Sequence, residues 1–185
     1  MNINSHLRQI VDELTQTTER VSSSEAEQLV NAIIEAKRVF VTGSGRSGFM
    51  GKSFAMRMMH MGIDAYVIGE TVTSTFTKDD LLILGSGSGE TKMLIPVAEK
   101  AKEIGGKVSV VTISPKSTLG TLADFTVKLP GAKKDQTNSD YQTVQPMGSL
   151  FEQTLLLFYD ALILRFMEKK GLDTHKMYGK HANLE

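Results

Sequence analysis

The segments VFVTGSGRSG (residues 39–48) and LLILGSGSGE (residues 81–90) each place a short apolar run directly before a Gly-Ser-Gly turn. An amphipathic stretch follows each turn. Short apolar strands, glycine-rich turns and amphipathic crossovers in alternation are typical of βα units in a parallel sheet. Too little else repeats between the two segments to indicate a duplicated domain. The two segments therefore predict an α/β fold.

Five apolar runs continue this pattern along the chain. We expect strands at residues 39–42, 65–68, 81–85, 107–113 and 125–129, with crossover helices near residues 47–61 and 91–104. The predicted arrangement is a doubly wound five-stranded parallel sheet in the flavodoxin-like strand order 2-1-3-4-5. Residues 131–143 are polar and rich in turn formers, so they indicate a surface loop.

Helical patterns precede and follow the predicted sheet. Two helices are expected within residues 3–36, and the spacing of Ser24 and Glu27 is that of a capping box. A long helix is expected over residues 147–170, where apolar side chains cover more than one stripe. Because such a helix needs burial on several sides, we expect it to pack on its own sheet and on a second copy of the chain in a homo-oligomer.

Length and composition favour one domain over residues 1–185. The chain has 41% hydrophobic side chains, and its 21 basic side chains balance 21 acidic ones. Because the charges cancel, we expect neither a nucleic-acid partner nor attraction to an anionic membrane. The first residues lack the features of a secretory signal, and no apolar stretch reaches the roughly 20 residues of a bilayer span, so a cytoplasmic protein is expected. The chain has no cysteine, which excludes disulfides and thiolate chemistry.

The two Gly-Ser-Gly turns predict an anion site. Ligands of open α/β sheets bind beyond the carboxyl ends of the strands, where both turns fall. In SGSGET (residues 86–91), the glycines allow close backbone approach, and Ser86, Ser88 and Thr91 supply hydroxyls beside a predicted helix start. Neutral donors at the positive end of a helix dipole bind a phosphate dianion well, so phosphate is the expected group.

Two other interpretations of these turns stay open. Either turn alone is equally well explained as an ordinary βα turn with a helix cap, because serine and glycine are common in turns and caps. The sequence GSGRSG (residues 43–48) also matches the G-x-G-x-x-G pattern of dinucleotide sites, with Glu70 as the acidic residue near the end of the second strand. The serine-rich second turn is not part of that pattern, and hydroxyls at two neighbouring strand ends favour phosphate.

Four motifs together resemble the 6-phospho-3-hexuloisomerases, sugar isomerases of the SIS-domain family. They are GSGRSG (43–48), SGSGET (86–91), QPMGSLFEQ (145–153) and the terminal HANLE (181–185), and the resemblance covers nearly the whole chain. SGSGET alone is similar to the phosphate loops of SIS domains in general, which include isomerases, aminotransferase halves and sugar-phosphate-sensing regulators. The last two motifs narrow the resemblance to the hexuloisomerases.

The resemblance implies an enzyme that interconverts 3-hexulose 6-phosphate and fructose 6-phosphate. Such enzymes act in the ribulose monophosphate pathway of formaldehyde assimilation, where hexulose-6-phosphate synthase is the pathway partner. The resemblance further implies a homotetramer that uses no metal and no organic cofactor.

The residues offer a mechanism for such an isomerase. Moving a carbonyl between neighbouring carbons needs a base that removes a proton and returns it to the adjacent carbon through a cis-enediolate. The resemblance makes Glu152 the candidate base, whereas an acidic residue near a helix N-terminus is otherwise explained by the helix dipole. His181 is the candidate acid that moves protons on substrate oxygens or opens the furanose ring, in its own or a neighbouring subunit.

Further side chains complete the predicted site. Ser44 is expected to line the crevice, and Arg46 to bind substrate oxygens or neutralise the enediolate, although an arginine beside a surface turn is more often solvated. Glu70 is a lesser candidate as a second carboxylate. We expect no metal, because His6 and His175 have no partners at metal-ligand spacing.

Two other functions stay open at this point. A non-catalytic sugar-phosphate sensor would use the same loops, but such sensors usually append a DNA-binding domain, and the residues before the first strand contain no helix-turn-helix pattern with a basic face. Only the resemblance favours a 6-phospho-3-hexuloisomerase over an isomerase of a heptose or arabinose phosphate. The chemistry of a phosphate loop does not count the carbons of the sugar.

Overall fold

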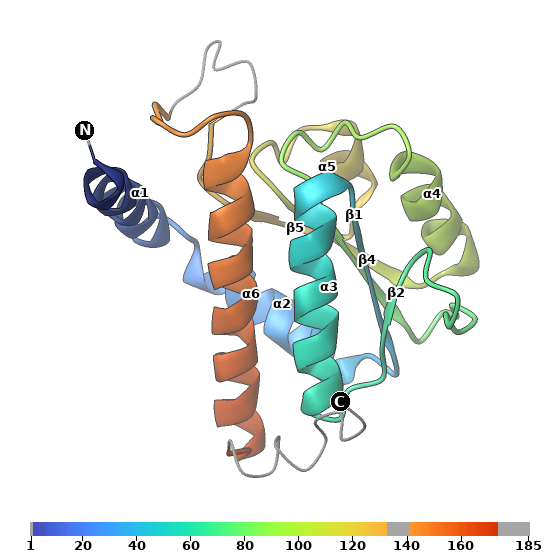
Figure 1. Ribbon diagram of the computed structural model, residues 1–185. Coiled ribbons are helices and arrows are strands. Elements are labelled where there is room, and N and C mark those ends of the chain that lie inside the picture. The colour runs from blue at the N-terminus through green and yellow to red at the C-terminus, as the bar shows by residue number, and fades with distance from the viewer. Residues whose placement is uncertain (1, 133–140, 174–185) are drawn as a thin grey trace.

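A five-stranded parallel sheet lies at the centre of the protein, and helices cover both of its faces (Figure 1). The computed structural model describes residues 2–132 and 141–173. The strand order β2-β1-β3-β4-β5 and the four parallel pairings confirm the predicted topology. The strands are β1 (Val39–Gly43), β2 (Ala65–Val67), β3 (Leu81–Gly85), β4 (Lys107–Thr112) and β5 (Phe125–Lys128).

Two layers of helices enclose the sheet. The helices are α1 (Ile3–Thr18), α2 (Ser23–Glu35), α3 (Gly45–His60), α4 (Ile95–Ile104), α5 (Thr118–Leu122) and α6 (Ser149–Lys170). Buried residues of α2, α3 and α6 form one apolar cluster with one face of the sheet, while α4 and α5 form a second cluster with the other face. Val39 and Val41 belong to the first cluster and Phe40 to the second, as the alternation of a strand requires.

Glycines let the helices approach the carboxyl ends of the strands closely. A Cβ atom at Gly48 would lie 2.7 Å from the carbonyl oxygen of Gly43, so the start of α3 touches the end of β1. A Cβ atom at Gly85 would lie 3.0 Å from Leu155 Cδ2, so α6 packs directly on the end of β3. These contacts bring α3 and α6 side by side at the sheet edge where the Gly-Ser-Gly turns begin (Figure 1).

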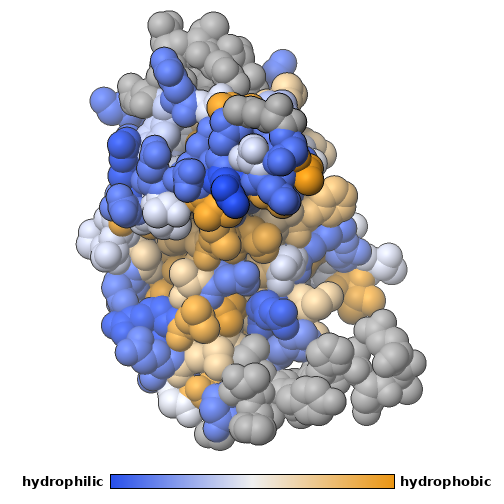
Figure 2. All heavy atoms as spheres, turned by 60° about the vertical axis from the view of Figure 1, so that its left-hand side comes forward, coloured by the Kyte–Doolittle hydropathy of each residue, from blue (hydrophilic) through white to orange (hydrophobic). Residues whose placement is uncertain are grey.

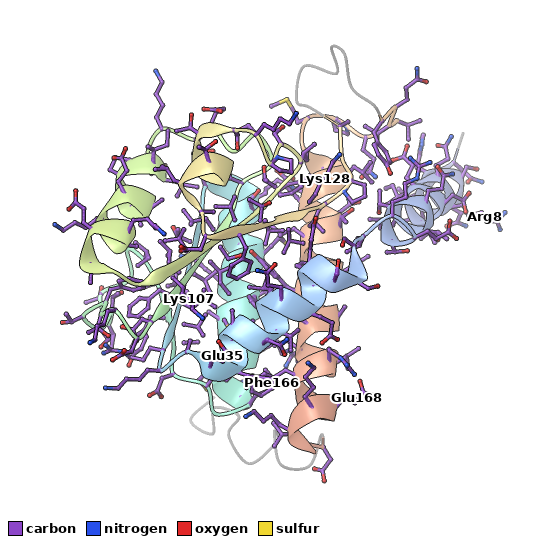
Figure 3. All side chains as sticks on the ribbon, turned by 180° about the vertical axis from the view of Figure 1, so that it is seen from behind. Arg8, Glu35, Lys107, Lys128, Phe166 and Glu168 are labelled. Carbon is purple, nitrogen blue, oxygen red and sulfur yellow. The ribbon has the colours of Figure 1, made fainter. Side chains whose placement is uncertain are left out.

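Helix α2 is held to the sheet by contacts at both of its ends. Figure 3 shows Glu35 near the end of α2 beside Lys107 at the start of β4, and their charged atoms are 3.1 Å apart. Near the start of α2, the Glu25 carboxylate accepts a hydrogen bond from the backbone N–H of Lys128 at 2.7 Å. Helix α2 therefore spans the sheet from β4 to β5.

Several predicted boundaries are corrected by the structure. Helix α4 begins at Ile95 and not near residue 91, because Pro96 occupies the first turn, where a proline is favoured. Ser22 caps α2 by accepting from the N–H of Glu25, so the predicted capping box at Ser24 is wrong. Its supposed partner, Glu27, instead pairs with side chains of α6.

Strand β3 has the predicted bounds, the ends of the other predicted strands and helices differ by a few residues, and α5 was not predicted. Helix α6 begins at Ser149 with Gly148 as its N-cap residue. Within the described residues, no helix is both long enough and apolar enough to cross a membrane.

Candidate active site

A cavity of about 1070 Å³ opens at the carboxyl ends of the central strands. Most of its lining comes from four segments: 44–47 after β1, 85–91 after β3, 113–117 after β4, and 146–152 at the start of α6; Ala132 also contributes. In the register of the sheet, Gly43 lies opposite Gly85, so the two Gly-Ser-Gly turns leave neighbouring strands at the same level. The prediction that both turns meet at one crevice is therefore geometrically satisfied.

The second turn holds three hydroxyls in one loop. Ser86 Oγ lies 3.0 Å from Thr91 Oγ1 and accepts a hydrogen bond from the N–H of Gly89 at 3.2 Å. Ser88 Oγ accepts from the N–H of Glu90 at 3.2 Å. Only one hydroxyl hydrogen is used between Ser86 and Thr91, so the other can be donated to a ligand, as can that of Ser88. The loop therefore presents O–H donors for an anion.

Gly89 sets the shape of this loop. Its φ is +67°, and a Cβ atom there would lie 1.8 Å from Ser117 Oγ. A side chain at this position would meet both backbone strain and a steric clash. The loop after β3 is thus packed against the loop after β4.

The helix start nearest to the first turn belongs to α3. Ser44 is the N-cap residue of α3, but its side chain makes no capping hydrogen bond and lies 3.6 Å from Met93 Sδ. Ser44 therefore occupies the N-cap position, but its hydroxyl does not cap the helix. Helix α4 begins four residues after Thr91, so the predicted helix start at Thr91 is corrected. The helix N-terminus that lines the cavity belongs to α3.

Glu152 and Arg46 meet at the rim of the crevice. The Nε–H of Arg46 donates to Glu152 Oε2 at 2.5 Å. The side chain of Glu152 is 11% exposed, whereas that of Arg46 is 59% exposed. The second oxygen, Oε1, has no hydrogen bond within the described part of the chain, so it can accept a proton from a ligand. The pair combines a largely enclosed carboxylate with a cation that has room to move.

The structure brings together Ser44, Arg46, Ser86, Ser88, Thr91 and Glu152 of the predicted site. It does not bring Glu70 to the cavity, because the Glu70 carboxylate pairs with Lys52 Nζ of α3 at 2.5 Å on the surface. The dinucleotide interpretation therefore lacks its acidic residue at the crevice. His181, the other predicted catalytic residue, lies outside the described residues.

The loop after β4 lines the cavity and was missed from the sequence. It contributes Ser114, Lys116 and Ser117, in the segment ISPKS (residues 113–117). This segment lacks the Gly-Ser-Gly pattern, but its place directly after a strand was a usable signal. Lys116 adds an exposed positive charge to a crevice whose predicted donors were mostly neutral.

The cavity lining contains a second carboxylate besides Glu152, that of Glu90, which was not predicted. Its oxygens accept hydrogen bonds from the N–H and the hydroxyl of Thr118, at 2.8 and 2.7 Å. These hydrogen bonds, the backbone one first, hold the pKa of Glu90 below its ordinary value. Glu90 thus joins the loop after β3 to the start of α5. Within the described residues, no three His, Cys, Asp or Glu side chains are grouped as a metal site would require.

Comparisons with known proteins agree with this architecture. The SIS domain family model matches residues 32–162. Over 185 residues, covering all of both chains, the sequence is 52% identical to 3-hexulose-6-phosphate isomerase of Bacillus subtilis. It is 36% identical to 3-hexulose-6-phosphate isomerase of Mycobacterium gastri, covering all of this chain and 92% of that one.

A solved structure gives the same result. The crystal structure of a Methanococcus jannaschii protein, from which a molecular function of 3-hexulose-6-phosphate isomerase was inferred, matches with a TM-score of 0.83 at 34% identity. The match covers 98% of this chain and 99% of that chain. With the fold, the crevice and these relatives in agreement, the chain belongs to the SIS-domain family and, within it, to the family of the 3-hexulose-6-phosphate isomerases.

Proposed function

We propose that this crevice catalyses the interconversion of 3-hexulose 6-phosphate and fructose 6-phosphate. One observation carries the proposal: a loop of hydroxyl donors and a largely enclosed carboxylate, Glu152, line the same cavity. The names of the two curated relatives supply the substrate, because the chemistry of the loop accounts for a phosphate and not for the length of the sugar.

The loop of residues 86–91 is the phosphate site in this proposal. Ser86, Ser88 and Thr91 donate to the phosphate oxygens, and Ser44 lies at the adjacent turn. Lys116, on the neighbouring loop, adds a charge that attracts the dianion. Bound in this way, the sugar extends toward the start of α6.

Glu152 is the general base of the proposal. Its free oxygen removes the proton from C2 of 3-hexulose 6-phosphate, and the electron pair forms the C2–C3 double bond while the C3 oxygen takes the negative charge. A proton moves between the two oxygens, the O2 carbonyl forms, and Glu152 returns its proton to C3. One carboxylate serves both transfers because the enediolate is cis, with C2 and C3 side by side. His181 is the proposed acid for the oxygens.

Arg46 has two uses in this reaction. One N–H of its guanidinium holds the base, and the remaining N–H groups are available to the substrate oxygens. Negative charge develops on these oxygens as the enediolate forms, so a cation beside them lowers the barrier. The high exposure of Arg46 in the free protein leaves it able to turn toward a substrate.

We further propose that the chain, as one SIS domain, forms a homotetramer through exposed apolar side chains. Phe49 and Met56 of α3 are 63% and 58% exposed, and Leu157 and Leu164 of α6 are 43% and 67% exposed. Each pair is spaced by seven residues, so each lies on one side of its helix. Figure 2 shows hydrophobic residues gathered across the middle of one face, bordered by hydrophilic ones. Sedimentation equilibrium measures the assembly, and a monomer at micromolar concentration contradicts this proposal.

The proposed cellular setting is the ribulose monophosphate pathway in the cytoplasm. There hexulose-6-phosphate synthase joins formaldehyde to ribulose 5-phosphate, and its product is the proposed substrate of this chain. The relatives named 3-hexulose-6-phosphate isomerase support the isomerase step of this setting.

A coupled assay tests the proposed activity. Hexulose-6-phosphate synthase, ribulose 5-phosphate and formaldehyde generate the substrate in place, and fructose 6-phosphate formation is followed. Glu152→Gln keeps the shape of the base but removes its proton affinity, so kcat should fall by about 10³-fold or more with KM nearly unchanged. Glu168→Gln, on the exposed end of the same helix, is the matched control and should keep full activity. Product formation by Glu152→Gln at the wild-type rate contradicts the assignment of the base.

The wild-type protein separates the remaining functions. If it forms no fructose 6-phosphate but is stabilised against heat by another sugar phosphate, it is an isomerase of a different substrate or a sensor. If it forms product, the sensor interpretation fails.

A further inference from the structure

The carboxylate of Glu13 binds the segment that leads into α6. Residues 143–149, which we call the rim segment, run from the loop before α6 into its first turn, and their last part lines the cavity. Glu13 lies on α1 and accepts from Thr143 Oγ1 at 2.6 Å, from the N–H of Val144 at 2.7 Å and from Gln145 Nε2 at 2.9 Å. Three consecutive residues of the rim segment thus donate to one side chain far away in sequence.

The rim segment contains a strained residue directly after these contacts. Met147 has a φ of +59°, and it is the only non-glycine residue with a positive φ in the described parts of the chain. The side chain of Met147 is 62% exposed, so its own burial does not hold it in place. A non-glycine residue keeps this conformation only where its surroundings impose it. The contacts on either side of Met147 must therefore supply the restraint.

Those contacts lead from Glu13 to Glu152. Gln145 lies two residues before Met147 and is 4% exposed, and its side-chain amide donates to Glu13. After it, the N–H and hydroxyl of Ser149 donate to the carbonyl of Pro146 at 3.2 and 2.8 Å, closing a tight turn. The carbonyl of Gly148 then accepts from the N–H of Glu152 at 3.0 Å. The turn that leads to Glu152 therefore follows directly on the residues that Glu13 binds.

We propose that Glu13 is a positioning residue for the reaction: it holds the rim segment so that the strained turn starts α6 where Glu152 meets Arg46 and the phosphate loop. The proposal rests on the function proposed above. Attachment of α1 alone does not explain the contact, because Thr17 Oγ1 of α1 lies 3.2 Å from Thr154 Oγ1 of α6 in a separate buried contact. In Figure 1, α1 lies beside the upper part of α6 and the rim segment.

Two variants on α1 serve as controls, one for the attachment of α1 to α6 and one for the loss of a negative charge on α1. Glu13→Ala removes all three acceptor bonds to the rim segment. Thr17→Val removes the second contact of α1 without touching the rim segment. Asp12→Asn removes a neighbouring charge at an exposed position. If the proposal holds, Glu13→Ala lowers kcat by about 10- to 100-fold and changes KM by less than about threefold, as a base displaced by about 1 Å would. Thr17→Val and Asp12→Asn then keep kcat within about twofold of wild type.

A second set of variants keeps the test decisive if Glu13→Ala does not fold. Glu13→Asp retains the charge but shortens the side chain, and Gln145→Ala removes one donor from the opposite side. Both should lower kcat, and the losses of Glu13→Asp and Gln145→Ala should combine less than additively, because they act on one contact. Losses in kcat that simply add would contradict the proposal that Glu13 and Gln145 act through one contact.

Hydrogen exchange separates this inference from the proposed function. In Glu13→Ala, amides of residues 143–152 should exchange faster than in wild type, while amides of β3 and β4 stay unchanged. If wild type is inactive on 3-hexulose 6-phosphate, the proposed function fails, and exchange in the rim segment alone still tests the hold. Wild-type kcat in Glu13→Ala, or a loss that Thr17→Val reproduces at equal thermal stability, overturns the inference.

Discussion

Replacing Gly89 with alanine tests how the proposed phosphate loop, residues 86–91, is built. The φ of Gly89 is +67°, which costs a residue with a Cβ atom roughly 1–2 kcal/mol. The new Cβ would also lie 1.8 Å from Ser117 Oγ and 2.5 Å from Ser117 Cβ, so rotating the hydroxyl does not relieve the overlap. Ser117 caps α5 by accepting from the N–H of Gly120, and displacing it costs about 1 kcal/mol more. Gly89→Ala should therefore destabilise the protein by about 2–3 kcal/mol.

Thermal unfolding and steady-state kinetics measure the two consequences. The unfolding midpoint should fall by roughly 4–12 °C. Because Ser86 and Ser88 move with the loop, KM for the sugar phosphate should rise by at least about tenfold, equivalent to 1.4 kcal/mol of binding. The double variant Gly89→Ala/Ser117→Gly removes the overlap and should recover part of the loss in both measurements. A Gly89→Ala protein with wild-type KM and unfolding midpoint would refute this account of the loop.

Two further predictions concern the hydroxyls of residues 86–91 and the buried Asp80, which lies directly before β3. Ser86→Ala and Thr91→Ala should each raise KM by roughly 3- to 30-fold with little change in kcat. An unchanged affinity for sugar phosphates in a calorimetric titration would refute the assignment of residues 86–91 as the phosphate site. Asp80 is buried, which alone raises its pKa, but hydrogen bonds from Arg38 and Thr77 outweigh burial and hold that pKa below its ordinary value. Its stabilising effect is therefore complete above about pH 4 and is lost as the pH falls through the lowered folded-state pKa. Asp80→Asn should cost about 3–5 kcal/mol in urea unfolding at pH 7, and a difference from wild type that fails to shrink in acid would contradict this explanation.

The sheet was predictable because its signals are local. Each strand is a short apolar run that ends at a glycine or polar turn, and β3 is buried along its whole length. Helix α5 escaped prediction because its five residues are too few to show a helical period. For α2, two serines compete for one cap, and a distant contact decides between them: Glu27 is drawn to Arg165 and Lys169 of α6. Boundaries set by such contacts are not written in the neighbouring sequence.

The candidate site also contains some residues with a clear local sequence signal and others without one. The hydroxyls of residues 86–91 follow one strand and act in one loop, so a sequence pattern locates them. Lys116 also follows a strand, but its segment has neither paired glycines nor a repeated serine pattern, so the strand-end position was its only signal. The cavity needed a third loop, and only the register of β3 and β4 shows that this loop reaches the other two.

Glu152 marks the limit of local reasoning, since what favours a base here comes from distant parts of the chain. Its side chain is enclosed because Gly85 and Gly87 let α6 approach the strand ends, and its partner Arg46 is 106 residues away in sequence. Position in the first turn of a helix explains an acidic residue equally well without any reaction. The contact with Arg46 favours the catalytic explanation over the helix dipole, because the dipole alone does not account for a cation at the same carboxylate. A base paired with a movable cation beside a phosphate loop is instead what an enediolate intermediate requires, with the charge of the cation available when the proton has left.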